Sequence, residues 1–440
     1  MINLFDTYTQ ASWDLHYSLL VAGYNNPTIV INDDGYLPND VTSPYLFFTG
    51  FDPKAEETPL YFNQITVPEF WEIRGNNSQG EIYDYAEKKG HIHYATPAHK
   101  RLVKSVDWYD KKGVTRVTDR YNKQGYRFAQ TVYNASAQAS LTSYFNAKNQ
   151  EVIVENHHTG DITLNYQGKV YIFKSKTDFI IFYLKEAGFK LDGIFYNSLS
   201  TPFLVAYYLE GERQDVLFWQ EDIKDAIPGN MQLLVKKGPH HTKVMVQDKE
   251  AYQRMLPLLS EEQKEVVSYL GLMYPSARDN HNRKEALIFT NSDQIEHISD
   301  LVTQLPGLHF HIGAVTEMSS RLMDLGKYDN VTLYPNISTP MVQHLQAKCD
   351  IYLDINQGGE ILSAVRSAFE NQMLILAFTN TLHQPKYVAK HHIYQLTDVA
   401  DMIAVLQSVL SHQKNLPDLV LEQNAALSIA TEKDYQTLLG

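Results

Sequence analysis

Two pairs of histidines are spaced so that a strand would bring both imidazoles of a pair to one face. The pairs are His91 with His93 and His309 with His311. Alternate residues of a β-strand share a face, and two imidazoles on one face could bind zinc, which needs three or four protein ligands. Neither pair has a third ligand at a fixed spacing. We therefore expect no metal site.

Other motifs that carry chemistry are missing or incomplete. The sequence has no Gly-x-Ser-x-Gly nucleophile motif and no phosphate-binding P-loop. The run Asn32–Gly35 resembles the start of a calcium loop, but the later bidentate glutamate is missing, so we interpret it as a turn. Cys349, the single cysteine, precedes a predicted strand, and we expect it to be buried rather than nucleophilic. These observations predict a protein without a cofactor.

Composition limits the class of protein. The 440 residues carry a formal net charge of -13 and are 44% hydrophobic, which supports large cores and disfavours binding to nucleic acid. One cysteine cannot form an internal disulfide, as is typical of a reducing compartment. The start of the chain has no signal-peptide pattern, and apolar runs such as Phe179–Leu184 are too short to span a membrane. We expect a soluble, cytoplasmic protein.

The elements that must position any site include a repeated turn. Four similar segments begin at Tyr109, Tyr121, Tyr133 and Phe145, twelve residues apart. Asp or Asn follows each aromatic residue, and these side chains stabilise turns. Strand-forming residues lie between the turns, so the pattern predicts an antiparallel meander that continues to Phe173. We interpret this sheet as a docking surface, with an ordinary β-domain that packs on its own neighbours as the alternative.

Strand and helix patterns alternate on both sides of the meander. Before and after it, strands are predicted at Thr28–Ile31, Tyr45–Phe48, Phe179–Leu184, Gly193–Tyr196, Asp215–Trp219 and Lys243–Val246, and helices at Ser12–Gly23, Pro202–Glu210 and Asp248–Leu258. Further strands are predicted at Ala286–Phe289, Leu308–Ile312, Val331–Leu333, Asp350–Leu353 and Met373–Ala377, and helices at Asp293–Leu305, Glu317–Leu325, Val342–Ala347, Ile361–Glu370, Asp398–Leu410 and Leu419–Leu439. We predict an α/β domain over 1–75 and 176–255, an inserted sheet domain over 76–175, and a second α/β domain over 256–440.

The order of elements over about 285–380 resembles the C-terminal half of two-domain retaining glycosyltransferases. Residues Gly358-Gly359-Glu360 through Phe378 resemble the helix and strand of their donor site. The resemblance implies a GT-B-like α/β fold, with two Rossmann-like domains facing a cleft and, in this chain, an extended antiparallel β-meander inserted. Catalytic members carry two glutamates separated by seven residues, and an Arg and a Lys after the first strand of the domain.

The sequence departs from this donor-site pattern in both features. With seven residues between them, the partner of Glu360 would stand at position 368, which is Ala368, and no Arg or Lys directly follows the strand Ala286–Phe289. Each lost charge-assisted hydrogen bond to a diphosphate would cost about 1.5–3 kcal/mol. We therefore predict a degenerate donor site, which comprises Asn291, Ser292, Asp293, Gly359, Glu360, Arg366 and Ser367.

Over its full length the chain is similar to the non-catalytic stabilising co-activators of accessory-Sec polypeptide O-GlcNAc transferases. The resemblance lies in Trp13–Ser18, Asp107–Asp110, Asp119–Asn122, Phe128–Thr131 and Glu151–Asn156. It implies a hetero-oligomer with a catalytic O-GlcNAc transferase subunit that uses UDP-GlcNAc. It also implies binding of a Ser/Thr-rich adhesin polypeptide, no transferase activity of the chain alone, and a peripheral position on the cytoplasmic face of the membrane through the complex.

The meander supplies the candidate contacts with acceptor or partner. They are Arg116, Arg120, Tyr121, Arg127 and Tyr133. The alternative is that the tyrosines form cross-strand packing pairs and the arginines are solvated. Two other functions stay open from the sequence. One is an active retaining glycosyltransferase in which Glu360 or Glu370 binds donor and Arg366 binds a phosphate, and the other is a scaffold that never touches the acceptor.

Overall fold

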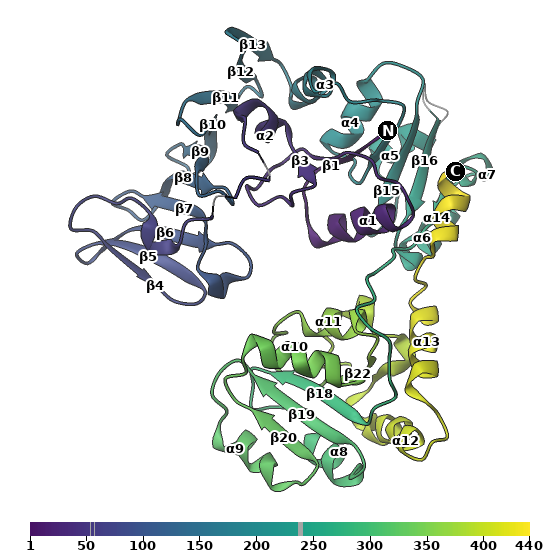
Figure 1. The fold of residues 1–440 in the computed structure, drawn as a ribbon. Helices are drawn as coiled ribbons and strands as arrows, with labels where there is room; N and C mark the ends of the chain where they lie inside the picture. The colour runs from purple at the N-terminus through teal and green to yellow at the C-terminus, as the bar shows by residue number, and fades with distance from the viewer. Residues whose placement is uncertain (53, 57, 236–240) are drawn as a thin grey trace. The chain divides into compact units, whose positions relative to one another are not determined.

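Two compact units make up the chain (Figure 1). The computed structural model describes residues 1–52, 54–56, 58–235 and 241–440. The first unit contains residues 1–271 and 432–440, and the second contains residues 272–431. Three sheets organise these units, two of them parallel and one antiparallel.

A seven-stranded parallel sheet lies in the first unit, in the order β17-β16-β15-β14-β1-β2-β3. Its strands are β1 (Ile2–Phe5), β2 (Thr28–Val30), β3 (Val41–Thr42), β14 (Ile194–Tyr196), β15 (Gln214–Trp219), β16 (His241–Val246) and β17 (Val267–Tyr269). The helices of this part are α1 (Gln10–Val21), α2 (Pro44–Thr49), α3 (Lys176–Glu186), α4 (Thr201–Tyr208), α5 (Gly229–Val235), α6 (Lys249–Met255) and α7 (Glu261–Lys264).

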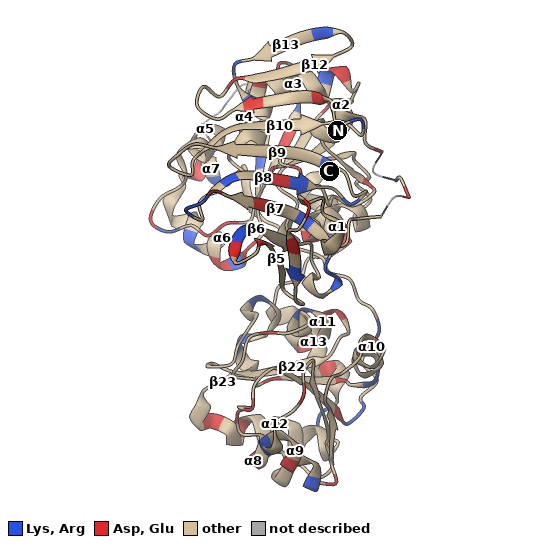
Figure 2. Cartoon of the chain, turned by 90° about the vertical axis from the view of Figure 1, so that its left-hand side faces the viewer, with Lys and Arg blue, Asp and Glu red and all other residues tan. Residues whose placement is uncertain are grey.

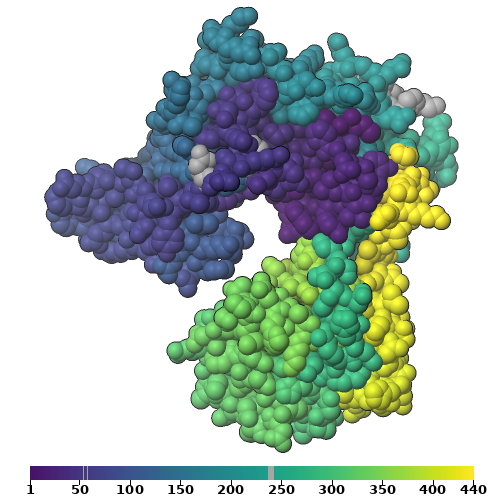
Figure 3. Space-filling model, viewed as in Figure 1, coloured from purple at the N-terminus to yellow at the C-terminus, as the bar shows by residue number. Residues whose placement is uncertain are grey.

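The last helix, α14 (Glu432–Leu439), also belongs to the first unit. Its Tyr435 is fully buried and donates a hydrogen bond of 3.0 Å to the carbonyl of Gly271. Figure 3 shows this yellow segment against the purple amino-terminal part of the chain. Residues at the two ends of the sequence are therefore packed in one body.

The antiparallel sheet also lies in the first unit, with ten strands in simple sequence order. They are β4 (Glu72–Gly75), β5 (Gln79–Asp84), β6 (Glu87–Tyr94), β7 (Val103–Tyr109), β8 (Thr115–Tyr121), β9 (Arg127–Tyr133), β10 (Ala139–Phe145), β11 (Glu151–Asn156), β12 (Ile162–Tyr166) and β13 (Lys169–Phe173). The predicted meander is confirmed, and it begins four strands before the repeated turns. In one such turn Asn134 accepts hydrogen bonds from the backbone of Ser136 and Gln138, as expected of an Asx turn.

The strands β9–β13 have two unlike faces. On the inner face Tyr144 stacks on Tyr45 of α2, with ring centroids 4.1 Å apart, and Ile153 and Leu164 are fully buried. The opposite, outer face carries Val132, Leu141, Val170 and Ile172, which are 41%, 41%, 65% and 64% exposed. Figure 2 shows that charged residues are sparse along β9, β10, β12 and β13.

The second unit is built on a six-stranded parallel sheet in the order β20-β19-β18-β21-β22-β23. The strands are β18 (Glu285–Thr290), β19 (His309–Ala314), β20 (Val331–Tyr334), β21 (Ile351–Asp354), β22 (Leu374–Phe378) and β23 (Ile393–Tyr394), and the helices are α8 (Ile298–Gln304), α9 (Ser320–Met323), α10 (Thr339–Lys348), α11 (Ala364–Glu370), α12 (Val399–Leu410) and α13 (Leu416–Ala426). Ile288 enters one hydrophobic core, whereas Leu287 and Phe289 enter another. Both faces of the sheet are therefore covered.

Two predicted strands are wrong. Tyr45–Phe48 lies in α2, where Ser43 caps the helix by accepting a hydrogen bond from Leu46, and Phe179–Leu184 lies in α3, which Ser175 caps. Short apolar runs fit a buried strand and a buried helix equally well, and the capping serines decide for helix. Strand β1 (Ile2–Phe5) was not predicted, although it lies at the centre of its sheet.

Several predicted helices of the second unit begin too early or run too long. Helices α8, α9 and α11 start at Ile298, Ser320 and Ala364, because the residues before them form loops after the parallel strands. The predicted helix Leu419–Leu439 is two helices, α13 and α14. Loops at the carboxyl ends of parallel strands are where α/β proteins bind ligands, so these corrections concern the candidate donor site directly.

Candidate donor site and sheet surfaces

Glu360 fills the place at the start of α11 where a donor phosphate would need backbone N–H groups. Its Oε1 accepts a hydrogen bond of 3.1 Å from the backbone N–H of Val365, and its Oε2 accepts one of 2.8 Å from the Gln384 amide. A carboxylate is favoured at a helix start because the unpaired N–H groups there carry partial positive charge. Glu360 therefore stabilises the helix and repels an anion from it.

Arg366 is also committed to contacts within the protein. Its Nε donates to Glu370 Oε1 over 2.7 Å, one of its terminal nitrogens donates to the Tyr387 hydroxyl over 2.9 Å, and its side chain is only 13% exposed. Ser367 lies in the middle of α11 and accepts hydrogen bonds at its carbonyl from the backbone and side chain of Asn371. This arrangement disfavours the alternative in which Arg366 binds a phosphate and Glu370 a donor sugar.

The two glycines of the donor-site loop are held close to the first strand. A Cβ atom on Gly358 would lie 1.9 Å from Asn291 Oδ1, so any other residue at 358 would force the Asn291 side chain to move. Asn356 donates to Asn291 Oδ1 over 3.2 Å and to the Gly359 carbonyl over 3.3 Å. Asn291 and Gly359, which the sequence assigned to one site, are thus neighbours in space.

His383, in the loop that follows β22, contacts the same loop. Its Nδ1 lies 2.5 Å from Asp354 Oδ1 and its Nε2 lies 2.7 Å from the Gly358 carbonyl, so each ring nitrogen faces an acceptor. Burial alone would lower the pKa of His383, but the hydrogen bonds to Gly358 and Asp354 outweigh it and raise the pKa above its ordinary value. The His383 ring is therefore held by partners within the protein, Asp354 and Gly358.

A pocket of about 400 Å³ lies at the carboxyl ends of β18 and β19. Its lining is Thr290, Asn291, Ser292, Asp293, Gln294, Ala314, Thr316, Glu317 and Leu322. Within the described chain this lining has two carboxylates and no lysine or arginine. A diphosphate placed there would face two like charges and find no cation, which is the opposite of what phosphate sites provide.

The five candidate contacts on the antiparallel sheet do not form one site. Arg116 pairs with Asp110 at 2.7 Å, and Arg127 lies 4.8 Å above the Phe145 ring and donates to Asn149 over 2.8 Å. Tyr121 packs against the small core under β4–β7, and burial raises its pKa to about 12. Tyr121 is thus packed, as in the packing alternative, whereas Arg116 and Arg127 have partners within the protein instead of being solvated.

Arg120 and Tyr133 differ from the other three. Both line a pocket on the inner face of the sheet, beside the loops that follow β1 and β2. Among the described residues we find no hydrogen-bond or ion-pair partner for the Arg120 side chain. Sequence reasoning named both residues, but it could not separate them from the others, because the partners of the other arginines are fixed only by the fold.

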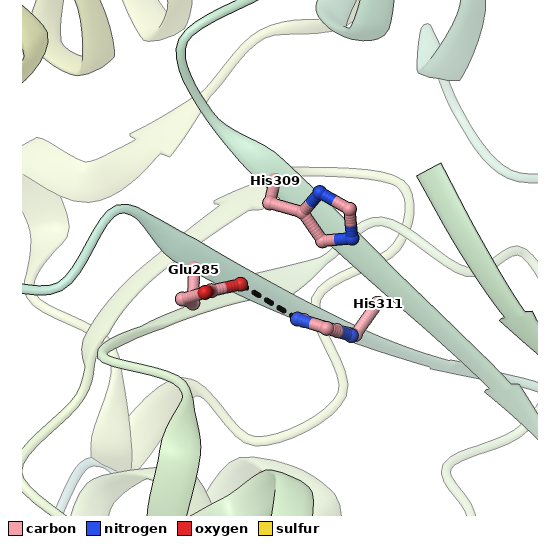
Figure 4. Close-up of side chains that lie close together, drawn as sticks. All are labelled: Glu285, His309 and His311. Atoms are coloured by element: carbon pink, nitrogen blue, oxygen red, sulfur yellow. Dashed lines mark hydrogen bonds and ion pairs between the residues drawn. The ribbon is translucent and has the colours of Figure 1, made fainter. Parts of the chain in front are cut away.

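The histidine pair on β19 has a third neighbour that sequence spacing did not reveal. The parallel register places Glu285 of β18 opposite His309, and Glu285, His309 and His311 offer ligand atoms within 4.8 Å of one another (Figure 4). The sequence offered no third ligand at a fixed spacing, and the fold brings one from the neighbouring strand. Sequence spacing could not reveal Glu285, because the pairing of β18 with β19 brings together residues that are 24 positions apart in the chain.

Lys348 brings a positive charge to two members of this cluster, Glu285 and His311. Its Nζ lies 3.3 Å from Glu285 Oε1 and 3.3 Å from His311 Nε2, and His311 Nε2 lies 2.7 Å from Glu285 Oε2. Burial lowers the pKa of His311, although Glu285 partly opposes this. His309 pairs with Thr332 at 2.8 Å. Each polar group already has a partner, so we interpret the cluster as a charge network between strand ends.

Cys349 is fully buried, as predicted, and burial raises the pKa of its thiol to about 12. A thiol with such a pKa is almost entirely protonated at neutral pH and is a poor nucleophile. No helix among the described residues is long and apolar enough to cross a bilayer.

Comparison with known proteins agrees with this geometry. Four family models match, namely the GtfB N-terminal domain at 2–48, the GtfB middle domain at 71–174, the GtfB third domain at 176–258 and the GftB/GlyA-F C-terminal domain at 286–423. A UDP-N-acetylglucosamine–peptide N-acetylglucosaminyltransferase stabilizing protein GtfB of Streptococcus parasanguinis is 49% identical over 393 residues, which cover 89% of this chain and 88% of that protein. The chain belongs to the GtfB family of stabilizing proteins.

Solved structures extend the comparison. A chain of the crystal structure of the GtfA/B complex bound to UDP and GlcNAc is 45% identical, covers 100% of both chains and has a TM-score of 0.94. The pneumococcal O-GlcNAc transferase GtfA in complex with UDP and GlcNAc is 12% identical, with a TM-score of 0.53 over 99% of this chain and 97% of that one, which shows a shared fold alone. The family resemblance stated from the sequence is confirmed.

Proposed function

We propose that the chain is the non-catalytic subunit of a polypeptide O-GlcNAc transferase, in which it stabilises the catalytic subunit and holds the Ser/Thr-rich acceptor polypeptide. The proposal rests on the full-length similarity to a chain of the GtfA/B complex. It is supported by the pocket at the candidate donor site, which is lined by Asp293 and Glu317 and by no described lysine or arginine. The catalytic partner then binds UDP-GlcNAc. An active glycosyltransferase remains the competing function.

The lack of activity follows from charge. A nucleotide-sugar brings a diphosphate, and charge-assisted hydrogen bonds to it contribute about 1.5–3 kcal/mol each. In this chain Glu360 occupies the start of α11 and Arg366 is neutralised by Glu370. Donor binding would require these groups to leave partners at 2.7–3.1 Å.

The outer face of β9–β13 is the surface that we assign to the catalytic partner. Val132 and Leu141 are opposite each other on adjacent strands, and Val170 and Ile172 extend the apolar area to the edge strand β13. Exposed apolar area of this kind marks interaction sites, and the open edge of β13 could also accept a strand of the partner.

The finer description of the architecture is also part of the proposal. We infer a GT-B-like arrangement of two Rossmann-like domains with an inserted sheet domain at 76–175. The predicted limits of 1–75 with 176–255 and of 256–440 are shifted, because β17 and α14 belong to the first unit, so we place the first domain at 1–75, 176–271 and 432–440 and the second at 272–431. Support comes from the strand orders, because in each parallel sheet the first strand is central and the chain then continues to either side. We also place the protein in the cytoplasm, where a single buried thiol is stable.

Calorimetry with UDP-GlcNAc tests the proposal directly. We expect no binding to the isolated chain at micromolar donor, and binding to its complex with the catalytic subunit. Co-expression of the acceptor with the catalytic subunit, with and without this chain, should give full glycosylation only when both subunits are present. Micromolar donor binding together with sugar transfer by the chain alone would establish the competing function.

A further inference from the structure

A polar pocket of about 470 Å³ lies between the parallel sheet of the first unit and the inner face of the antiparallel sheet. One wall comes from loops after β1 and β2, and the other comes from strands β7–β11. The lining is Thr7, Asn32, Asp33, Asp34, Lys104, Ser105, Arg120, Thr131, Tyr133, Ala139, Thr142, Tyr144, Glu155, His157 and Lys176. The carboxyl edge of a parallel sheet is the usual place for a ligand in α/β proteins, and the volume suits a small ligand or a short peptide segment.

Arg120 is the charged side chain of this pocket for which the described residues offer no partner. It is partly buried on β8, and in the described parts of the chain it makes no hydrogen bond or ion pair. Arginine presents five N–H donors, and withdrawing them from water without an acceptor is unfavourable. Arg116, which lies on the same strand β8, forms an ion pair with Asp110 at 2.7 Å. The contrast indicates that Arg120 is kept for an acceptor from outside the chain.

The charges of the pocket balance, and most of them are already paired. Lys104 lies 2.7 Å from Asp34, and Lys176 lies 3.3 Å from Glu155. Asp33 accepts hydrogen bonds from the Gly35 backbone and the Ser43 hydroxyl. Three carboxylates face three cations in all. A phosphate or another multiply charged anion would meet these carboxylates, so the pocket favours a neutral ligand.

Hydroxyl groups supply the remaining polar surface. Thr131 and Thr142 are 2.8 Å apart, and Thr142 lies 2.8 Å from His157 Nε2, which forms a short chain of hydroxyl and imidazole groups. Thr118 donates its one hydroxyl hydrogen to Asp107 over 2.6 Å, so Tyr133, 3.2 Å away, donates to Thr118 and its oxygen is available to accept from a ligand hydroxyl. Such groups exchange donor and acceptor roles freely, which suits a ligand rich in hydroxyls.

We propose that this pocket binds an unmodified Ser/Thr-rich segment of the acceptor polypeptide, with Arg120 donating to peptide carbonyl oxygens and Tyr133 and the Thr131–Thr142–His157 chain contacting hydroxyls. The assignment rests on the proposed function, which supplies a peptide substrate. A disordered polar peptide has few apolar anchors. It must be held by polar contacts of this type, and a backbone carbonyl is the acceptor that every peptide residue offers to an arginine.

Fluorescence anisotropy with a dye-labelled Ser/Thr-rich peptide tests the site, using the full chain in complex with its catalytic subunit. We expect Arg120→Gln to weaken peptide binding at least about tenfold, as loss of a charge-assisted hydrogen bond predicts. Arg74→Gln serves as the matched control, because Arg74 is an exposed arginine of β4, paired with Glu72 and remote from the pocket lining. The control should bind like the unaltered complex.

The outcomes separate this site from the proposed function. Thermal melting and co-purification with the catalytic subunit should be unchanged in Arg120→Gln, and their loss would show a structural role and overturn the site. Equal peptide affinity in Arg120→Gln and the unaltered complex would also overturn it, while the stabilising function stood. If free N-acetylglucosamine competed more strongly than unlabelled peptide, the ligand of this pocket would be the sugar and the peptide assignment would be overturned. Failure of the unaltered chain to join the catalytic subunit would count against the proposed function instead.

Discussion

Replacing two exposed residues of β13 should weaken assembly with the catalytic subunit. The perturbation is the double change Val170→Thr and Ile172→Thr, which keeps β-branched side chains and hence strand propensity. These residues are 65% and 64% exposed, so their apolar surface is free for a partner. Full burial of such a side chain contributes about 1.5–3 kcal/mol. The exposed two-thirds therefore corresponds to about 1–2 kcal/mol each.

Together the two changes should raise the dissociation constant by about 30- to 700-fold, which corresponds to about 2–4 kcal/mol. Biolayer interferometry with immobilised catalytic subunit measures this directly. Leu421→Gln is the matched control, because Leu421 is 66% exposed on α13 in the second unit. The melting temperature of the double variant should stay the same, since neither residue is part of a core.

A dissociation constant that changed less than threefold in the β13 variant would refute the assignment of the outer face. A comparable loss in Leu421→Gln would show that general loss of apolar surface, and not this face, is responsible. Point changes are preferable to deletion of 80–174. Deletion would expose Tyr45, Phe48 and Phe179, which are buried in the core that this sheet shares with α2 and α3, and loss of association could then reflect unfolding.

Three further predictions concern the second unit. Glu360→Gln should leave glycosylation by the two-subunit complex within about twofold, because Glu360 only caps α11 through Val365, and a large loss of turnover would place it in the reaction. Burial alone would raise the pKa of Asp350, but hydrogen bonds from Arg283 and Arg278 lower it; its stabilisation is therefore present above the unfolded pKa near 4 and is lost as the pH falls through the lower folded value. Urea unfolding of Asp350→Asn should show a loss of about 3–5 kcal/mol at pH 7 and a weaker pH dependence below pH 4, and an unchanged profile would contradict this account. Zn²⁺ should raise the melting temperature of Lys348→Met but not that of the unaltered chain, since the ammonium brings a positive charge to the cluster; equal shifts in both would show that the lysine is no barrier.

Local patterns in the sequence were enough for most of the architecture. The turns after Tyr109, Tyr121, Tyr133 and Phe145 specify antiparallel hairpins, because Asp and Asn side chains bond to the backbone of their own turn. Alternation of strand and helix patterns along the chain identified both parallel sheets. The lack of Arg and Lys directly after Ala286–Phe289 was also evident, because residue types are known from the sequence without the fold.

Local patterns failed where two structures suit the same short apolar run. The helices at Tyr45–Phe48 and Phe179–Leu184 depend on capping serines and on burial against the antiparallel sheet, which strengthen helix over strand. The short strand β1 gave no periodic signal in its four residues, and its place at the centre of a sheet is a matter of long-range pairing.

The sequence by itself determined the residue types of the degenerate donor site, and only the tertiary structure decided what those residues do. Glu360 caps a helix, and Arg366 is bound to Glu370. Glu285 joins the histidine pair because the parallel register sets it beside His309, 24 positions away, within hydrogen-bond reach of His311. Among the residues that the structure describes, Arg116 and Arg127 have partners and Arg120 has none, because hydrogen-bond partners are fixed by distances between strands, and those distances exist only once the chain has folded.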